Sequence, residues 1–149
     1  MSRVQLALNV ADIDQAVEFY GKLFGTPPAK VRPGYANFAI AEPPLKLVLV
    51  ESGAEPGSIN HLGVEVESTD EVAAATARLS GEGLPTATED GVSCCFAVQD
   101  KVWVDAPDGE SWEIYTVLAD APETPAATAE TADLCCSTAP ESAARCAPT

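Results

Sequence analysis

Two segments of the chain share one pattern of hydrophobic and polar positions. Residues 4–25 (VQLALNVADIDQAVEFYGKLFG) align without a gap with residues 60–81 (NHLGVEVESTDEVAAATARLSG). In each copy, apolar side chains first alternate with their neighbours, which is the period of a half-buried β-strand. Apolar positions then recur every three or four residues, which is the period of an amphipathic helix. The pattern therefore predicts one strand–helix unit that occurs twice.

Short-range signals mark the start of both predicted helices. Asp12 with Gln15, and Ser68 with Glu71, have the spacing of a capping box, in which the two side chains satisfy free backbone N–H groups. A glycine follows the last apolar position of each helix, as at many helix ends. Both helices are therefore predicted to begin and end at equivalent places.

Further strand-like runs follow each helix, and the third of them is long enough for two strands. They cover residues 35–42, 45–52, 93–106 and 111–117. The chain thus predicts an α+β fold in which a strand, a helix and two strands occur twice, with an extra strand in each half. Two such half-open sheets can close on each other around a cleft. We expect one domain over 1–118, with module one at about 1–56 and module two at about 57–118.

The composition changes near Ala119. From there to Thr149 the residues are mostly Ala, Pro, Thr, Glu and Ser, with a single leucine. Such a segment has too little apolar surface to offset the entropy lost on ordering. We expect 119–149 to be a disordered acidic tail.

Charge narrows the range of partners. Eight basic and 23 acidic residues give a formal net charge of −15. This field repels phosphate backbones and anionic lipid, so nucleic acid and membrane surfaces are not expected partners. No apolar run approaches the roughly 18 residues of a membrane span, and the start lacks the apolar centre of a signal peptide. A cytoplasmic protein is expected.

The five cysteines form two adjacent pairs and one single residue. Their odd number and the expected cytosolic setting favour thiols over disulfides. Adjacent residues of a regular strand point to opposite faces, so Cys94 and Cys95 could simply be one packed and one incidental thiol. A bulge or loop would let both thiolates bind one soft ion. Cys135, Cys136 and Cys146 lie in the predicted tail, either as incidental thiols or as an auxiliary trap for a soft metal or metalloid.

Three polar residues stand among apolar neighbours on predicted strands. Gln5 and His61, the single histidine, occupy equivalent positions in the two repeats, and Glu113 lies on the last strand. Each could be a hydrogen-bonded core or rim residue, or a solvent-facing one. Taken together, one nitrogen and two oxygen donors with open positions suit a divalent first-row metal.

Three stretches resemble a known superfamily. They are AVEFYGKLFG (16–25), HLGVEV (61–66) and DAPDGESWEIY (105–115), and the likeness spans residues 3–118. The chain resembles the vicinal-oxygen-chelate superfamily, which includes glyoxalase I, extradiol dioxygenases and bleomycin- and fosfomycin-resistance proteins. The resemblance implies paired βαβββ modules that form an open sheet cavity around a metal, with ligands at Gln5, His61 and Glu113. Superfamily members often form dimers, so a homodimer is one implied arrangement.

The resemblance also shows where the chain departs from its relatives. The first-half counterpart of Glu113 lies near Leu47 and is apolar, unlike the fourth protein ligand expected in glyoxalase I. Gln5 stands where extradiol enzymes have a second histidine. A three-ligand site suits Fe(II), while Mn(II) and Zn(II) are also compatible with these residue types.

A narrower resemblance covers the whole predicted domain. Residues 35–51, 61–68 and 94–115 are similar to the organoarsenical C–As lyases and the cadmium-induced proteins of this superfamily. It implies that the thiolates of Cys94 and Cys95 bind a trivalent organoarsenical, and that Fe(II) and O2 serve its cleavage to inorganic arsenite. The Lys101-Val102-Trp103 segment belongs to the same pattern. Sequestration of Cd(II) or As(III) without turnover, and a glyoxalase or thiol-transfer reaction, are the alternatives.

Overall fold

The computed structural model describes residues 2–94 and 96–120. Within them, two helices accompany one eight-stranded sheet, an α+β fold as predicted. In chain order the elements are β1 (Arg3–Asn9), α1 (Ile13–Phe24), β2 (Lys30–Arg32), β3 (Tyr35–Ile40), β4 (Leu45–Val50), β5 (Ile59–Glu65), α2 (Thr69–Gly81), β6 (Ala87–Cys94), β7 (Ala97–Asp105) and β8 (Ser111–Asp120).

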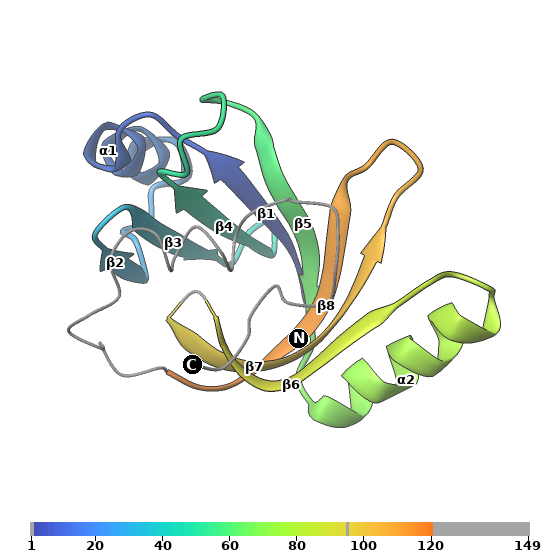
Figure 1. Ribbon diagram of the computed structural model, residues 1–149. Coiled ribbons are helices and arrows are strands. Elements are labelled where there is room, and N and C mark those ends of the chain that lie inside the picture. Colours follow the sequence, from blue (N-terminus) through green and yellow to red (C-terminus); the bar gives the residue numbers. More distant parts are fainter. Residues whose placement is uncertain (1, 95, 121–149) are drawn as a thin grey trace.

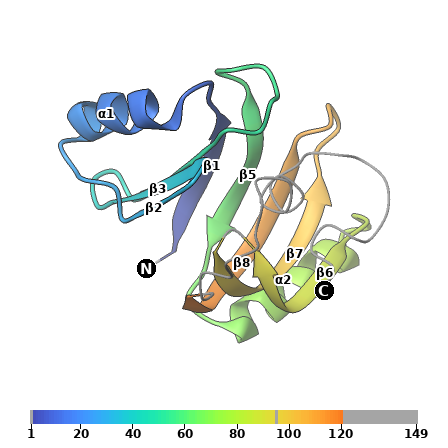
Figure 2. The ribbon, with the colours of Figure 1, turned by 60° about the vertical axis from the view of Figure 1, so that its left-hand side comes forward.

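The sheet is built from two βαβββ modules with the same connectivity. Its strand order is β2-β3-β4-β1-β5-β8-β7-β6. In module one β1 pairs with β4 in parallel, and in module two β5 pairs with β8 in parallel. The modules meet where β1 and β5 pair antiparallel. The sheet curls into an open half-barrel, as Figures 1 and 2 show, and the predicted duplicated cavity fold is confirmed.

The helices cover the outer face of the curled sheet. α1 packs on β3 and β4, over a core that includes Ile13, Phe38 and Leu47. α2 packs on β7 and β8, over a smaller core around Val72 and Val102 (Figure 1). Because side chains alternate along a strand, the neighbours of these core residues point to the inner, concave face.

Both predicted helix starts are confirmed. The Asp12 side chain accepts a hydrogen bond from the backbone N–H of Gln15 at 2.9 Å, and Ser68 accepts one from Glu71 at 3.3 Å. Gly25 ends α1 with φ of 61°, a left-handed conformation that a side chain would disfavour. These contacts fix where the chain leaves β1 and β5, which are the two central strands.

The extra strands lie at the two edges of the sheet. β2 is a three-residue strand in module one, and β6 is the edge strand of module two. The run over 93–106 does hold parts of two strands. β8 continues to Asp120, beyond the expected domain end at residue 118, while the rest of the predicted tail lies outside the described residues. Neither described helix has the length and apolar character to cross a membrane.

Candidate metal centre

The three predicted ligands meet on the concave face, at the seam between the modules. The sheet register places Gly63 of β5 between Gln5 of β1 and Glu113 of β8. His61 lies two residues before Gly63 and therefore points to the same face. The fold thus brings together side chains from β1, β5 and β8 that the repeat only partly related to one another.

The three side chains form one buried cluster. Gln5 Nε2 lies 3.1 Å from His61 Nε2 and donates to Glu113 Oε1 at 2.7 Å. His61 Nε2 is 3.3 Å from Glu113 Oε1. All three residues are buried. The whole set is therefore shielded from bulk water and presents its polar atoms to one point.

These separations suit ligands of a common ion. Donors about 2.1 Å from a metal and at right angles to each other lie about 3 Å apart. The amide of Gln5 would have to present Oε1 in place of Nε2, which needs a half-turn about its last side-chain bond. Across residues 2–94 and 96–120, no group of three or more His, Cys, Asp and Glu could hold a metal, so a site here depends on the glutamine.

Hydrogen bonds fix the tautomer of His61. Asn60 Nδ2 donates to Asn9 Oδ1 at 2.9 Å, which leaves Asn60 Oδ1 to accept from His61 Nδ1 at 2.8 Å. The proton of the neutral ring is then on Nδ1, and the lone pair of Nε2 faces Gln5 and Glu113. This is the arrangement that a metal-binding histidine needs.

Lys101 completes the charge balance of the cluster, a role that the sequence did not indicate. Its side chain is 2% exposed, and Nζ lies 2.8 Å from Glu113 Oε2. Burial alone would raise the pKa of Glu113, but the positive charge of Lys101 holds it well below its usual range. Glu113 therefore stays a carboxylate. The Trp103 ring packs against the His61 ring, with the two ring centroids 5.6 Å apart. The Lys101 Nζ lies over the Trp103 ring, 5.3 Å from its centroid.

Tyr115 is a second neighbour that the sequence pattern missed. Its hydroxyl makes a short hydrogen bond to Gln5 Oε1 and lies 3.2 Å from Glu65 Oε2. Burial, followed by the charges of Glu113 and Glu65, raises the pKa of Tyr115 far above its usual range. The hydroxyl therefore keeps its proton. In the sequence, an aromatic residue within an alternating apolar strand indicates core packing. The contact becomes visible only from the pairing of β5 with β8, which places Tyr115 opposite Glu65.

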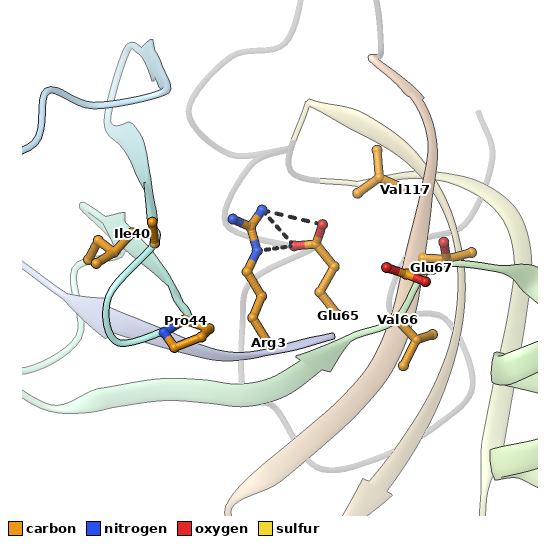
Figure 3. Close-up of a pocket in the computed structure, with 9 residues that line it drawn as sticks. Arg3, Ile40, Pro44, Glu65, Val66, Glu67 and Val117 are labelled. Atoms are coloured by element: carbon orange, nitrogen blue, oxygen red, sulfur yellow. Dashed lines mark hydrogen bonds and ion pairs between the residues drawn. The ribbon is translucent and has the colours of Figure 1, made fainter. Parts of the chain in front are cut away.

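A cavity opens beside this tyrosine, at the end of the seam. It has a volume of about 470 Å³ and is lined by residues from both modules, including Arg3, Pro44, Glu65 and Val117. Figure 3 shows the Arg3 and Glu65 side chains paired in its centre, with Arg3 Nε 3.1 Å from Glu65 Oε2. The Glu65 carboxylate thus joins the cavity wall to Tyr115.

The first-half counterpart of Glu113 is apolar, as expected. Gly63 is equivalent to Ala7 in the repeat, and Ala7 pairs with Val48, so Val48 rather than the adjacent Leu47 occupies that place. Leu47 points to the core under α1. Module one therefore offers Gln5 alone to the cluster.

Cys94, the first residue of the cysteine pair, lies where β6 ends and the chain turns toward β7. Cys94 ends β6 and pairs with Ala97, so the chain reverses after Cys94. The next described residue, Phe96, has φ of 64°, a left-handed conformation that is uncommon outside glycine. Predicted site residues Cys95, Cys135, Cys136 and Cys146 lie outside the described residues.

Contacts with module one hold this turn across the concave face. The Phe96 ring packs on Tyr35, with centroids 5.1 Å apart, beside the inner apolar group of Ala7, Val48 and Val50. Lys30 Nζ of β2 donates to the Phe96 carbonyl at 3.0 Å. The β6–β7 hairpin, at the module-two edge of the sheet, therefore reaches module one across the concave face, which also carries the buried cluster.

The chain belongs to the Glyoxalase/Bleomycin resistance protein/Dioxygenase superfamily, whose profile matches residues 3–114. Two curated relatives are very similar in sequence. The cadmium-induced protein CadI of Mycobacterium tuberculosis (strain ATCC 25618 / H37Rv) is 63% identical over 120 residues, covering 80% of this chain and 79% of that protein. A trivalent organoarsenical cleaving enzyme of Thermomonospora curvata is 62% identical over 122 residues, covering 81% of each.

Solved structures share the fold at low sequence identity. A Mn(II)-bound glyoxalase from Novosphingobium aromaticivorans aligns with a TM-score of 0.59 at 22% identity, over 83% of this chain and 42% of that one. Homoprotocatechuate 2,3-dioxygenase from Arthrobacter globiformis aligns with a TM-score of 0.57 at 20% identity, over 78% and 36%. Both likenesses concern the fold alone.

Proposed function

We propose that this protein is an Fe(II)-dependent, O2-using enzyme that cleaves the C–As bond of trivalent organoarsenicals and releases inorganic arsenite. The observation that carries the proposal is the buried Gln5–His61–Glu113 cluster, on the concave face that the β6–β7 hairpin crosses after Cys94. The 62% identical relative named an organoarsenical cleaving enzyme supports the choice of substrate.

The residues fit the proposed metal in donor type, burial and spacing. His61 Nε2, a Glu113 oxygen and the Gln5 amide oxygen would hold Fe(II), which supplies dioxygen activation when bound. Mn(II) could occupy the same donors. Lys101 balances the charge of Glu113 from the side away from Gln5, and Asn60 keeps the His61 lone pair directed at the cluster.

The hairpin would bind the substrate. Trivalent arsenic is soft, so the thiolates of Cys94 and Cys95 would displace its oxygen ligands and leave the As–C bond as its third attachment. The Phe96–Tyr35 contact would hold that end of the hairpin over the concave face and limit the access of water. This binding would raise the reaction rate through proximity, because the substrate carbon is kept near the buried cluster.

The proposed reaction balances without an added reductant. Methylarsonous acid, CH3As(OH)2, and O2 contain the same atoms as arsenous acid, As(OH)3, and formaldehyde. The carbon is oxidised while dioxygen is reduced, and arsenic stays trivalent. Arsenite and formaldehyde are therefore expected in equal amounts.

A single-turnover assay tests the proposal. The protein is loaded with Fe(II) and methylarsonous acid without oxygen, O2 is admitted, and arsenite and formaldehyde are measured. Cys94→Ala and Cys95→Ala should each lose turnover by at least about 100-fold while Fe(II) binding is unchanged, because the thiols hold substrate and not the metal. Ser93→Ala is the matched control in the same hairpin and should retain activity.

Sequestration without turnover is the second candidate, because a 63% identical relative is named a cadmium-induced protein. It predicts that Cd(II) or As(III) binds through the same cysteines and that no arsenite or formaldehyde appears after O2 is admitted. Full activity of either cysteine variant would remove the thiols from both functions.

A further inference from the structure

We infer that Tyr115, supported by Glu65, is a positioning residue that turns the amide oxygen of Gln5 toward the metal. The inference rests on the metal site of the proposed function and adds to it the residue that selects the ligand atom of Gln5. Tyr115 itself would not touch the metal or the substrate.

Gln5 has to change its orientation when a metal binds. Its Nε2 group now faces both His61 Nε2 and Glu113 Oε1, and it donates to these acceptors. A metal would use the same lone pairs, and an N–H group cannot share that space with a cation. The amide must therefore rotate so that Oε1 faces the metal and Nε2 faces the opposite side.

The opposite side of the amide is where Tyr115 lies. Gln5 is buried, so an Nε2 group turned that way needs an acceptor within the protein. The Tyr115 hydroxyl is already in contact with this end of the amide. A hydroxyl can donate to Oε1 in one orientation and accept from Nε2 in the other, which an aromatic ring without oxygen cannot do.

Glu65 makes the second arrangement favourable. When Tyr115 accepts from Gln5, its proton needs another acceptor, and Glu65 Oε2 is 3.2 Å away. Arg3 Nη2 at 3.1 Å and Lys46 Nζ at 3.6 Å from Glu65 Oε2 hold this side chain in place. A carboxylate accepts more strongly than an amide oxygen, so the Tyr115 proton would point to Glu65 once Gln5 turns. The pair thus favours the metal-binding orientation.

Mn(II) binding measures this directly. The free ion is followed by its EPR signal during titration of the metal-free full-length protein. Tyr115→Phe should weaken Mn(II) binding by about 10- to 100-fold, the usual effect of removing a partner of a metal ligand. Tyr20→Phe removes a hydroxyl on α1, on the other face of the sheet, and should bind Mn(II) as wild type does.

A second background separates positioning from general loss of structure. In Gln5→Glu, a carboxylate presents an oxygen to the metal whichever way it turns, so there is no orientation for Tyr115 to select. Adding Tyr115→Phe to Gln5→Glu should therefore change Mn(II) affinity by no more than about twofold, which is the precision of such double-mutant comparisons. Thermal unfolding of each metal-free variant confirms folding, and Glu65→Gln replaces Tyr115→Phe in both backgrounds if the latter fails to fold.

The outcomes distinguish the two proposals. Wild-type protein that binds no Mn(II) or Fe(II) would overturn the proposed function and this inference with it. Tight binding by wild type and equally tight binding by Tyr115→Phe would overturn the positioning role alone. Equal losses in the Gln5 and Gln5→Glu backgrounds would also overturn it, because the effect would not depend on the amide.

Discussion

Gly63 shows how a single missing side chain permits the buried cluster. It lies between Gln5 and Glu113 in the sheet. A Cβ atom at this position would lie 3.0 Å from Glu113 Cγ, 3.1 Å from the Glu113 carbonyl oxygen and 3.3 Å from Gln5 Nε2. Two of these atoms belong to the cluster itself, so the glycine leaves the space in which the amide and the carboxylate meet.

Gly63→Ala should therefore disturb the site before it disturbs the fold. The neighbours must move by some tenths of an ångström, and overpacking of this kind costs about 1–3 kcal/mol of unfolding free energy. Urea unfolding and Mn(II) titration would measure the loss of stability and of affinity. Gly81→Ala is the matched control, because a Cβ there meets open space. Unchanged affinity in Gly63→Ala would contradict the packing argument.

At this scale the sequence revealed the proposed ligands but not their partners. Gln5 and His61 were found through their equivalence in the repeat, and Glu113 through its place in an apolar strand. Lys101 and Tyr115 are directly paired across β7 and β8, and this register is not visible in the local pattern. Long-range pairing decides which side chains meet, so a periodic pattern alone cannot supply the outer contacts.

The β6–β7 hairpin depends on an anchor from the far edge of the sheet. Lys30 of β2 donates to the Phe96 carbonyl at 3.0 Å and to Asp120 Oδ1 at 2.6 Å. The hydrogen bond and charge of Lys30 lower the pKa of Asp120, so this end of β8 stays negative in mildly acidic solution. One short strand thus ties the hairpin turn and the end of β8 to module one.

Lys30→Met should loosen the hairpin turn without unfolding the sheet. Loss of one hydrogen bond is worth about 1 kcal/mol, which corresponds to about fivefold faster local opening. Hydrogen exchange at residues 97–99 would detect this change, and As(III) binding should weaken in parallel. Lys22→Met removes an exposed contact with Glu18 on α1 and should leave the hairpin unaffected. Equal exchange rates in both variants would show that Lys30 is not an anchor.

The elements themselves were largely predictable. The helix starts followed from Asp12 and Ser68, and the strand periods indicated where the sheet runs. The short strand β2 could not be located, because three residues carry too little periodicity. Its position at the sheet edge, where it supplies Lys30, comes from pairing with β3.

The duplicated fold places a buried ion pair close to its central seam. β1 and β5 join the modules, and β8 lies next to β5, so Glu113 and Lys101 sit where the two halves depend on each other. Breaking a buried ion pair by removing one partner leaves an uncompensated charge. The stability of the whole chain should therefore depend on the charge state of this pair.

Lys101→Met tests that dependence through pH. In the wild-type protein the pKa of Glu113 lies below its usual range, so the group contributes stability above about pH 4.3, its ordinary value, and this is lost as the pH falls further. Without Lys101, burial becomes the dominant influence and the pKa of Glu113 rises instead. The variant then loses stability as the pH increases, because the folded state must release a proton that it holds more tightly than the unfolded chain.

The unfolding free energies of the wild type and of Lys101→Met depend on pH with opposite signs. The difference in stability between the two proteins should therefore change with pH. At pH 7 the metal-free variant should be less stable by about 3–5 kcal/mol, and the gap should narrow at pH 4.5 as Glu113 becomes protonated. Urea unfolding in the presence of a chelator, with Lys22→Met as the exposed control, gives both values. A gap of the same size at both pH values would mean that Lys101 stabilises the seam by packing, and that the Glu113 charge is balanced elsewhere.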